Sequence, residues 1–260
     1  MMKIATWNVN SIKARLGHLL DWLDLATPDV VLLQELKCVD AEFPWTALEE
    51  RGWCCAVRGQ KAYNGVAVLS RLPILETVAT LDGDDGEARY LEAVLSNGVR
   101  VASIYVPMGQ STESDRFPFK LAFIDAVRRR AETLLTLDQP FVLGGDYNIT
   151  PDDRDVFDPR ALAGQVLAHP EERARLRRLL FLGLTDALRA LDDGAGRFSW
   201  WDYREGAWPR NRGLRIDHLL LSPLAADRLL RSGIDKTPRG WERPSDHTPV
   251  WVVLDNGTPA

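Results

Sequence analysis

The sequence predicts an α+β protein built from two packed β-sheets with helices on their outer faces. Short apolar runs bounded by Gly, Pro, Asn and Asp recur from residue 3 to residue 254, as β-strands do. Amphipathic stretches with helical spacing lie before and after a strand-rich middle. No linker, short repeat or low-complexity segment separates these elements, so residues 1–260 are expected to form a single domain.

Bulk composition indicates an ordinary globular protein. The chain has 260 residues, 45% hydrophobic and 27% charged, which is enough for a large core. Its formal net charge of −5 excludes a global positive field, so any contact with a polyanion must come from a local patch. The odd count of three cysteines predicts reduced thiols in a cytoplasmic protein. We expect no secretory signal and no membrane association, since the first residues run straight into a strand-like stretch and no apolar run approaches the ~20 residues of a membrane span.

The chain opens with a predicted strand, helix and strand. Residues 3–7 form the first apolar run, and Ser11 is a candidate N-cap for the helix that follows. The second run, residues 30–33, ends at Gln34 and Glu35. A strand–helix–strand unit favours parallel pairing of its two strands.

The remaining elements alternate between the two periodicities. Apolar runs separated by turn residues predict a mostly antiparallel meander and two later strands, at residues 53–57, 65–70, 74–80, 90–95, 99–106, 215–221 and 249–254. Helical spacing is found at residues 43–51, 117–137, 159–164 and 170–181. The last of these carries mixed charge and is expected to be a solvated, salt-bridged face.

The segment from Pro140 to Pro151 is the centre of the functional hypothesis. An apolar run there ends at two glycines and then presents Asp146 and Asn148. Glycines let a backbone approach a ligand closely, and if the strand continues, both side chains point to one side. An acid and an amide so placed could hold a phosphate and the water that attacks it. Taken alone, the segment favours the plainer interpretation, a strand that ends in an Asx turn, and only the rest of the chain outweighs it.

Other apolar runs also end in polar residues. Carboxylates in such buried positions are costly unless they are paired or bound to a cation. The oxygen-rich, thiol-poor set is the ligand chemistry of Mg²⁺ or Mn²⁺ and not of zinc, and it comprises Asn8, Glu35, Asp146 and Asp246.

His247 lies where a loop enters the final strand. A histidine beside a phosphate needs a carboxylate to fix its tautomer and stabilise its charged form, and Asp217 is the candidate partner. A purely structural His–Asp pair is the alternative.

Residues 197–215 combine aromatic side chains with five arginines inside an otherwise acidic protein. Such a patch could hold phosphates and stack a tryptophan where a base is missing. The alternative is an aromatic core corner with solvated arginines.

Six segments together carry a family resemblance. They resemble, in order and over nearly the whole chain, motifs of the exonuclease III family of apurinic/apyrimidinic (AP) endonucleases. The segments are Thr6-Trp7-Asn8-Val9-Asn10, Leu33-Gln34-Glu35-Leu36-Lys37, Tyr63-Asn64-Gly65-Val66-Ala67, Gly144-Gly145-Asp146-Tyr147-Asn148, Arg212-Gly213-Leu214-Arg215-Ile216-Asp217 and Pro244-Ser245-Asp246-His247-Thr248-Pro249-Val250. The resemblance implies a four-layer αββα sandwich and metal-dependent hydrolysis of DNA phosphodiesters.

The resemblance also implies roles for particular residues. The implied metal ligands are Glu35, Asn8 and, through water, Asp246, with Mg²⁺ as the ion and Mn²⁺ as its substitute. The implied catalytic residues are Asp146, which orients or deprotonates the attacking water, then Asn148, Tyr105 and His247, which grip the phosphate, and Asp217, which holds His247. The implied DNA-binding residues are Trp200 and Ile216, which form the pocket for the baseless sugar, with Trp201, Arg204 and Arg212.

Two positions bear on the place of this chain in the wider superfamily. Tyr105 stands where deoxyribonucleases of the pancreatic type and sphingomyelinase-like members have a second histidine, as in the abasic-site enzymes. Met108 departs from the family, which often has Asn or Gln there, and this departure puts a polar contact with DNA in doubt.

The expected function is cleavage of duplex DNA 5′ to abasic sites, with 3′→5′ exonuclease and 3′-end-cleaning activity, by a monomer. The motifs leave the balance of these activities open. A phosphatase acting on a small molecule or lipid is one alternative, against which the Trp/Arg segment argues. A catalytically silent DNA-binding relative is another, but it would lack equivalents of Glu35, Asp146 or His247, which are present.

Overall fold

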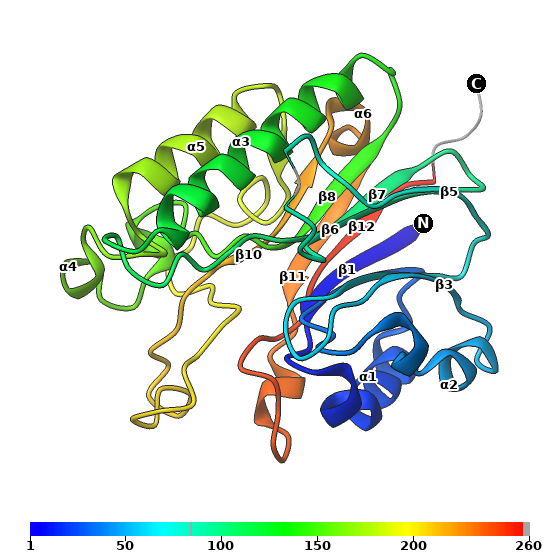
Figure 1. Ribbon diagram of the computed structural model, residues 1–260, viewed down its shortest axis with the longest axis horizontal. Helices are drawn as coiled ribbons and strands as arrows, with labels where there is room; N and C mark the ends of the chain where they lie inside the picture. Colours follow the sequence, from blue (N-terminus) through cyan, green and yellow to red (C-terminus); the bar gives the residue numbers. More distant parts are fainter. Residues whose placement is uncertain (84, 257–260) are drawn as a thin grey trace.

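Two six-stranded sheets lie face to face in the computed structural model, which describes residues 1–83 and 85–256 (Figure 1). Sheet A has the order β11-β12-β1-β2-β4-β3, with β1 Met2–Asn8, β2 Val30–Gln34, β3 Cys54–Arg58, β4 Val66–Ser70, β11 Leu229–Ile234 and β12 Val250–Leu254. Sheet B has the order β5-β6-β7-β8-β10-β9, with β5 Ile74–Val78, β6 Tyr90–Leu95, β7 Arg100–Tyr105, β8 Phe141–Asp146, β9 Thr185–Asp186 and β10 Asp217–Leu221. Both sheets mix parallel and antiparallel pairs.

Helices cover the outer faces of both sheets, with α1 and α2 beside sheet A and α3 and α5 beside sheet B (Figure 1). The helices are α1 Ile12–Ala26, α2 Trp45–Glu49, α3 Arg116–Leu135, α4 Pro159–Leu162, α5 Pro170–Leu180 and α6 Pro223–Ala226, with 3-10 turns at η1 Asp40–Glu42, η2 Asp153–Asp155 and η3 Thr237–Gly240. This arrangement confirms the predicted four-layer sandwich. Among the described residues, no helix has the length and apolar character that crossing a membrane requires.

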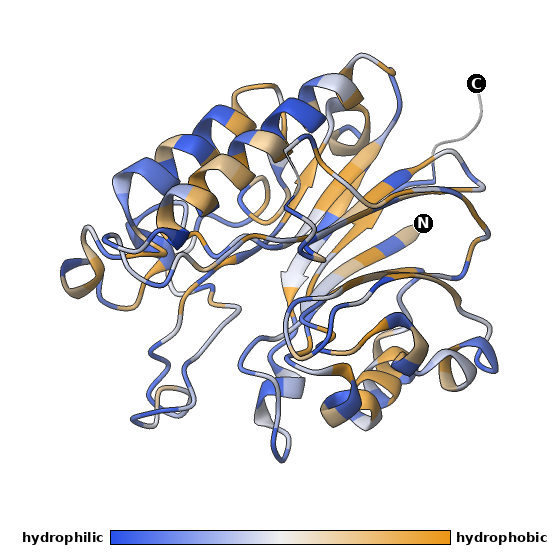
Figure 2. Cartoon of the chain, in the orientation of Figure 1, coloured by the Kyte–Doolittle hydropathy of each residue, from blue (hydrophilic) through white to orange (hydrophobic). Residues whose placement is uncertain are grey.

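The central strands are apolar on both faces because each sheet is covered on both sides. In β1, Ile4 faces the core between the sheets, whereas Ala5 and Trp7 face the core under α1. Leu32 and Leu33 divide in the same way in β2. Figure 2 shows the result, with apolar colour along the central strands and a mixture of colours along α3 and α5. Continuous apolar runs are therefore expected for strands buried on both faces.

The predicted parallel pairing of β1 with β2 is confirmed, and Ser11 caps α1 by accepting a hydrogen bond from the Ala14 amide. The strand β11 was not predicted from the sequence. It is an edge strand that contains Arg231, Ser232 and Gly233 and a register shift, so it lacks the apolar alternation of an interior strand.

The expectation of a solvated α5 holds only in part. Arg175 pairs with Glu171 and Asp125 at the surface, but Glu172 is fully buried against Lys120 of α3. A mixed-charge pattern cannot distinguish these positions, because burial of Glu172 depends on which helix packs beside it.

Two glycines let the layers approach each other at the end of β8. A Cβ at Gly144 would lie 2.5 Å from Leu32 Cδ1 of the facing sheet, and one at Gly145 would collide with the carbonyl group of Ile104 in β7. The glycines were expected to let a ligand approach the backbone closely. The structure instead shows that they accommodate neighbouring strands.

Replacement of Gly145 by alanine is expected to lower the free energy of unfolding by about 3 kcal/mol, because backbone atoms of β7 cannot move aside as a side chain can. The same replacement at Gly17 is the matched control. That glycine lies in α1 with no atom within 4 Å of an added Cβ, and alanine there should stabilise by up to about 1 kcal/mol. Urea denaturation measures both changes, and equal effects would contradict this account.

Candidate active site

Strand pairing brings the polar strand ends together at one edge of the sandwich. Asp146 at the end of β8 is in register with Tyr105 of β7 and with Asp217 of β10. Asn8 of β1 is likewise in register with Gln34 of β2, directly before Glu35. Side chains far apart in the sequence thus meet because the ends of neighbouring strands coincide.

Buried oxygen atoms crowd this edge. Asn8 Nδ2 donates hydrogen bonds to Glu35 Oε1 (2.8 Å) and to Asp146 Oδ2 (3.0 Å). One potential ligand atom from each of Glu35, Asp146 and His247 lies within 4.8 Å of the others. The amide oxygen of Asn8 accepts from the Asn10 amide, so Asn8 faces the carboxylates as a donor.

The turn that holds Glu35 has an unusual backbone. Glu35 and Lys37 both have left-handed φ angles, 53° and 54°. The amides of Leu36 and Lys37 donate to the carbonyls of Gly65 (3.1 Å) and Asn64 (2.9 Å). A Cβ at Gly65 would lie 2.8 Å from Leu36 Cβ, so the glycine permits this close contact. The Asn64-Gly65 segment therefore fixes the direction in which Glu35 points.

Two polar side chains at this edge were given no role by sequence analysis. Lys37 Nζ lies 2.8 Å from Glu35 Oε2 and also donates to Asn10 Oδ1. Asn10 Nδ2 in turn donates to Asp246 Oδ1 at 2.9 Å. Both residues belong to the motif segments that contain Asn8 and Glu35, and that proximity was the only signal available.

His247 lies between two carboxylates. Its Nδ1 is 2.9 Å from Asp217 Oδ2 and its Nε2 is 3.6 Å from Asp146 Oδ2. The Ser199 hydroxyl donates to Asp217 Oδ2 at 2.6 Å and so fixes that carboxylate. Burial disfavours a charged imidazole, but Asp217, Asp146 and Asp246 outweigh it and raise the pKa of His247 to about 10.

At Asp146, burial has a stronger effect on the pKa than the attraction of the neighbouring positive charge, whereas at His247 the charges prevail. Burial raises the pKa of Asp146 to about 7, and Asp217 and Glu35 add to this effect against the opposing charge of His247. The carboxylates thus exceed what His247 and Lys37 can neutralise. A site of this composition fits a divalent cation with oxygen ligands, which would relieve the repulsion.

Asn148 reaches the site by a turn. The strand ends at Asp146, and Asn148 has a left-handed φ of 51°. Its amide donates to Asp146 Oδ1 (2.9 Å), and its Nδ2 donates to the Val106 carbonyl at 3.0 Å. The two side chains do meet, but the expectation from strand alternation is wrong because the Asx turn, the other interpretation of this segment, is the one that forms.

Tyr105 completes the wall of the site beside Asp146. Burial, followed by the nearby charges of Glu35 and Asp146, raises its pKa well above the ordinary value. The guanidinium of Arg89 lies over its ring, 4.8 Å from the centroid. The hydroxyl therefore stays protonated and can act as a donor.

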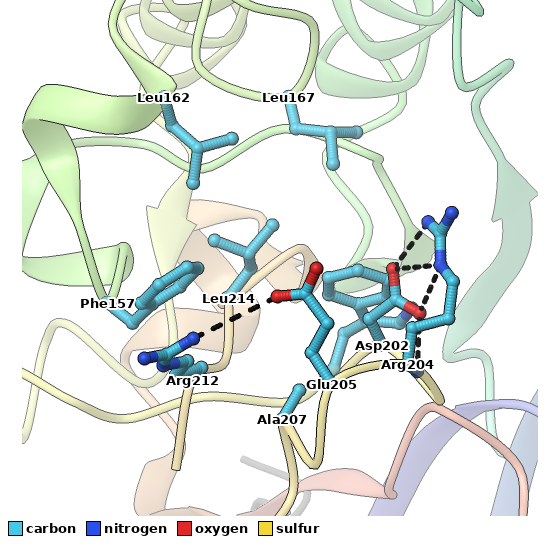
Figure 3. Close-up of a pocket in the computed structure, with 10 residues that line it drawn as sticks. Phe157, Leu162, Leu167, Asp202, Arg204, Glu205, Ala207, Arg212 and Leu214 are labelled. Atoms are coloured by element: carbon cyan, nitrogen blue, oxygen red, sulfur yellow. Dashed lines mark hydrogen bonds and ion pairs between the residues drawn. The ribbon is translucent and has the colours of Figure 1, made fainter. Parts of the chain in front are cut away.

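An apolar cavity opens next to these residues (Figure 3). It has a volume of about 390 Å³, and its apolar lining comprises Phe157, Leu162, Leu167, Trp200, Ala207 and Leu214. Ile216 is buried in the same cluster. Trp200 Nε1 donates to Asp246 Oδ2 at 2.9 Å, so this cavity and the polar edge share a wall.

Charged side chains surround the mouth of the cavity, where Arg204 pairs with Asp202 and Arg212 lies 4.0 Å from Glu205 (Figure 3). The side chain of Arg204 is 84% exposed. These two arginines are accessible to a polyanion from solvent.

Two aromatic and basic side chains of residues 197–215 are instead interior. Trp201 is fully buried, donates to Asn211 Oδ1 and packs edge-on against Trp208, so the expected contact of Trp201 with DNA is wrong. Arg215 is buried between Asp155 and Asp186. The local positive patch is therefore smaller than the sequence indicated.

Known proteins are similar to this chain in sequence over nearly its whole length. The family model described as "Endonuclease/Exonuclease/phosphatase family" matches residues 5–247. Exodeoxyribonuclease III of Haemophilus influenzae is 35% identical, over 96% of this chain and 99% of that protein.

Solved structures agree with the sequence matches. A 3′ phosphatase from Neisseria bound to a product DNA hairpin has a TM-score of 0.96 and 39% identity, covering 98% of this chain and 100% of the other. An AP endonuclease from Archaeoglobus fulgidus has a TM-score of 0.93 and 32% identity, with the same coverage. The chain therefore belongs to the endonuclease/exonuclease/phosphatase family and, within it, to the exonuclease III group.

Proposed function

We propose that this protein is a metal-dependent DNA repair nuclease that hydrolyses the phosphodiester 5′ to abasic sites and removes nucleotides or blocking groups from 3′ ends of duplex DNA. The observation that carries the proposal is the meeting of Glu35, Asp146 and His247 within 4.8 Å beside an apolar cavity whose mouth carries exposed arginines. The relatives support it, since they are named as an exodeoxyribonuclease, a 3′ phosphatase with product DNA and an AP endonuclease.

In this proposal, Asp146 orients the attacking water and accepts its proton. Its elevated pKa matches that task, because a base of near-neutral pKa is effective at neutral pH. His247 carries positive charge to the phosphate, and Asp217 holds its ring through Nδ1. Tyr105 and Asn148 donate from the neighbouring strand ends.

Glu35 is the proposed principal metal ligand, with Asp246 acting through water. Oxygen donors of this kind favour Mg²⁺, with Mn²⁺ as a substitute. A bound cation would neutralise charge that develops on the phosphate and lower the pKa of a nearby water or leaving oxygen. Asn8 would assist with its amide oxygen, which requires a rotation from its present orientation as a donor.

The cavity beside Trp200 is the proposed pocket for a sugar that has lost its base. Its walls, Trp200, Leu214 and the buried Ile216 behind them, offer apolar contacts to such a sugar. Arg204 and Arg212 would exchange Asp202 and Glu205 for DNA phosphates. We further propose that the chain acts as a single-domain monomer in the cytoplasm, where its three free cysteines would stay reduced.

Asp146→Asn is expected to lower kcat for incision by roughly 10³-fold, the usual worth of a positioned base, while the Kd for abasic DNA changes less than about threefold. Single-turnover cleavage and fluorescence anisotropy measure the two quantities. Asp193→Asn, at a carboxylate that is 86% exposed, is the control and should change neither. An equal loss of binding and rate would refute the role of Asp146 in the chemical step.

Glu35→Gln is expected to abolish the rise in Tm that saturating Mg²⁺ gives the wild-type protein, because a ligand of the folded state stabilises by mass action. Glu242→Gln is the control, at an ion pair that is 91% exposed. Calorimetry without DNA gives a readout that is independent of activity. A full Mg²⁺-dependent rise in the Glu35 variant would place the metal elsewhere.

Trp200→Ala is expected to lower kcat/KM at abasic sites by about 10- to 100-fold, the worth of one large apolar contact, and at ordinary 3′ ends by less than about threefold. Trp200→Phe keeps the ring surface but loses the hydrogen bond to Asp246, so it separates the two contributions. Parallel assays measure kcat/KM for each variant on both substrates. Equal losses in the Ala variant would reject the pocket.

A further inference from the structure

Lys120 is a buried cation that the proposed chemistry does not use. It lies in the first half of α3, and its side chain is fully shielded from solvent. Its Nζ lies 2.7 Å from the Asn148 carbonyl, 3.1 Å from the Met108 carbonyl and 2.6 Å from Glu172 Oε1. The ammonium therefore donates one hydrogen bond to each carbonyl, while the carboxylate of Glu172 balances its charge as an ion pair.

The two carbonyls belong to the loops that deliver the proposed catalytic groups. One loop begins directly after Tyr105, the last residue of β7, and contains Met108. The other begins directly after Asp146, the last residue of β8, and contains Asn148. Lys120 therefore joins the two loops through one hydrogen bond to each of them.

The bond to Asn148 acts where the backbone is strained. Because φ is positive at Asn148, its amide and side chain turn back to Asp146 and Val106, while its carbonyl turns inward to Lys120. A left-handed conformation is uncommon outside glycine, although asparagine adopts it more readily than most residues, and these hydrogen bonds hold it in place. Without the ammonium, that buried carbonyl would lose its partner.

The loop after β7 is built closely around the same side chain. Gly109 has a φ of 94°, and a Cβ there would lie 3.2 Å from Lys120 Cδ. Glu172 balances the charge and also accepts a hydrogen bond from the His169 amide at the start of α5. A buried ion pair is an inefficient way to join two helices, because apolar residues of the same volume often serve as well or better. Helix packing alone does not explain why a charged group lies here, but the two carbonyls that point toward the ammonium of Lys120 do.

We propose that Lys120 is a positioning residue of this active site. Its ammonium fixes the loops after β7 and β8 relative to each other, and thereby the geometry of Tyr105, Asp146 and Asn148. The inference rests on the proposed function for its catalytic consequence, but the structural consequence is measurable without a substrate.

Lys120→Met tests this inference, since methionine is unbranched, keeps most of the length of the side chain and removes all three donors. The expected result is a 10- to 100-fold loss in kcat with KM within about threefold, because a displacement of about 1 Å is costly to chemistry and less so to binding. The amide of Asn148 should also exchange its hydrogen at least tenfold faster.

Arg130→Met provides a matched control on the same helix. Arg130 pairs with the buried Glu92 at 2.7 Å and contacts neither loop, so its loss should reduce stability but leave kcat and the exchange at Asn148 within about twofold of wild type. Glu172→Gln removes the counter-charge but keeps the lysine and both carbonyls. It should retain kcat within about threefold.

The outcomes separate cleanly. Equal kcat losses for the Lys120 and Arg130 variants at equal Tm, or a loss confined to KM, would overturn the inference. A Glu172 variant as impaired as Lys120→Met would do so too. If the methionine variant does not fold, Lys120→Gln, which keeps an amide donor, should show a smaller loss that is again confined to kcat. If wild-type protein cleaves no DNA, the proposed function fails, and exchange at Asn148 alone still decides whether Lys120 holds the loop.

Discussion

Four carboxylates at the edge of a tightly packed sandwich are the constraint on which the site depends. Glu35, Asp146 and Asp217 converge because three pairs of strands end in register, and Asp246 joins them from the loop before β12. Such crowding is costly. The pKa of Asp146 is raised above its ordinary value by burial and by neighbouring carboxylates, and the pKa of His247 is raised because those carboxylates outweigh its burial. In the proposed function, the same repulsion would favour a bound cation and would keep the pKa of the proposed base, Asp146, near neutral.

The surrounding structure keeps that costly arrangement in place. Glycines at the end of β8 permit the sheets and strands to approach, and the turn at Asn64 and Gly65 directs Glu35. Left-handed residues at Glu35 and Asn148 lie in the proposed active site, and active sites are where such backbone conformations cluster. The rigid strands therefore set where the side chains of the site lie, and the short turns set the direction in which they point.

The sequence allowed the layers, the central strands and the convergence of Glu35, Asp146, Asp217 and His247 to be predicted, because these depend on local periodicity and on motif segments at strand ends. Other features depend on tertiary packing that no local pattern encodes. Trp201 and Arg215 lie in a segment whose composition predicts an exposed patch, yet neighbouring residues bury both side chains. In the sequence, Lys120 is one charge among several on an amphipathic helix, so its burial could not be predicted. The edge strand β11 has the composition of a loop.

The most direct test is a gel assay on one duplex with a single abasic analogue, run with Mg²⁺ and with EDTA beside a duplex with an intact base and a recessed 3′ end. The account predicts incision 5′ to the analogue and shortening of the recessed end, both only with Mg²⁺. A ladder from the 3′ end alone would retain the metal chemistry but contradict the sugar pocket. Absence of cleavage on either duplex, with active hydrolysis of a small phosphate ester, would contradict the central claim.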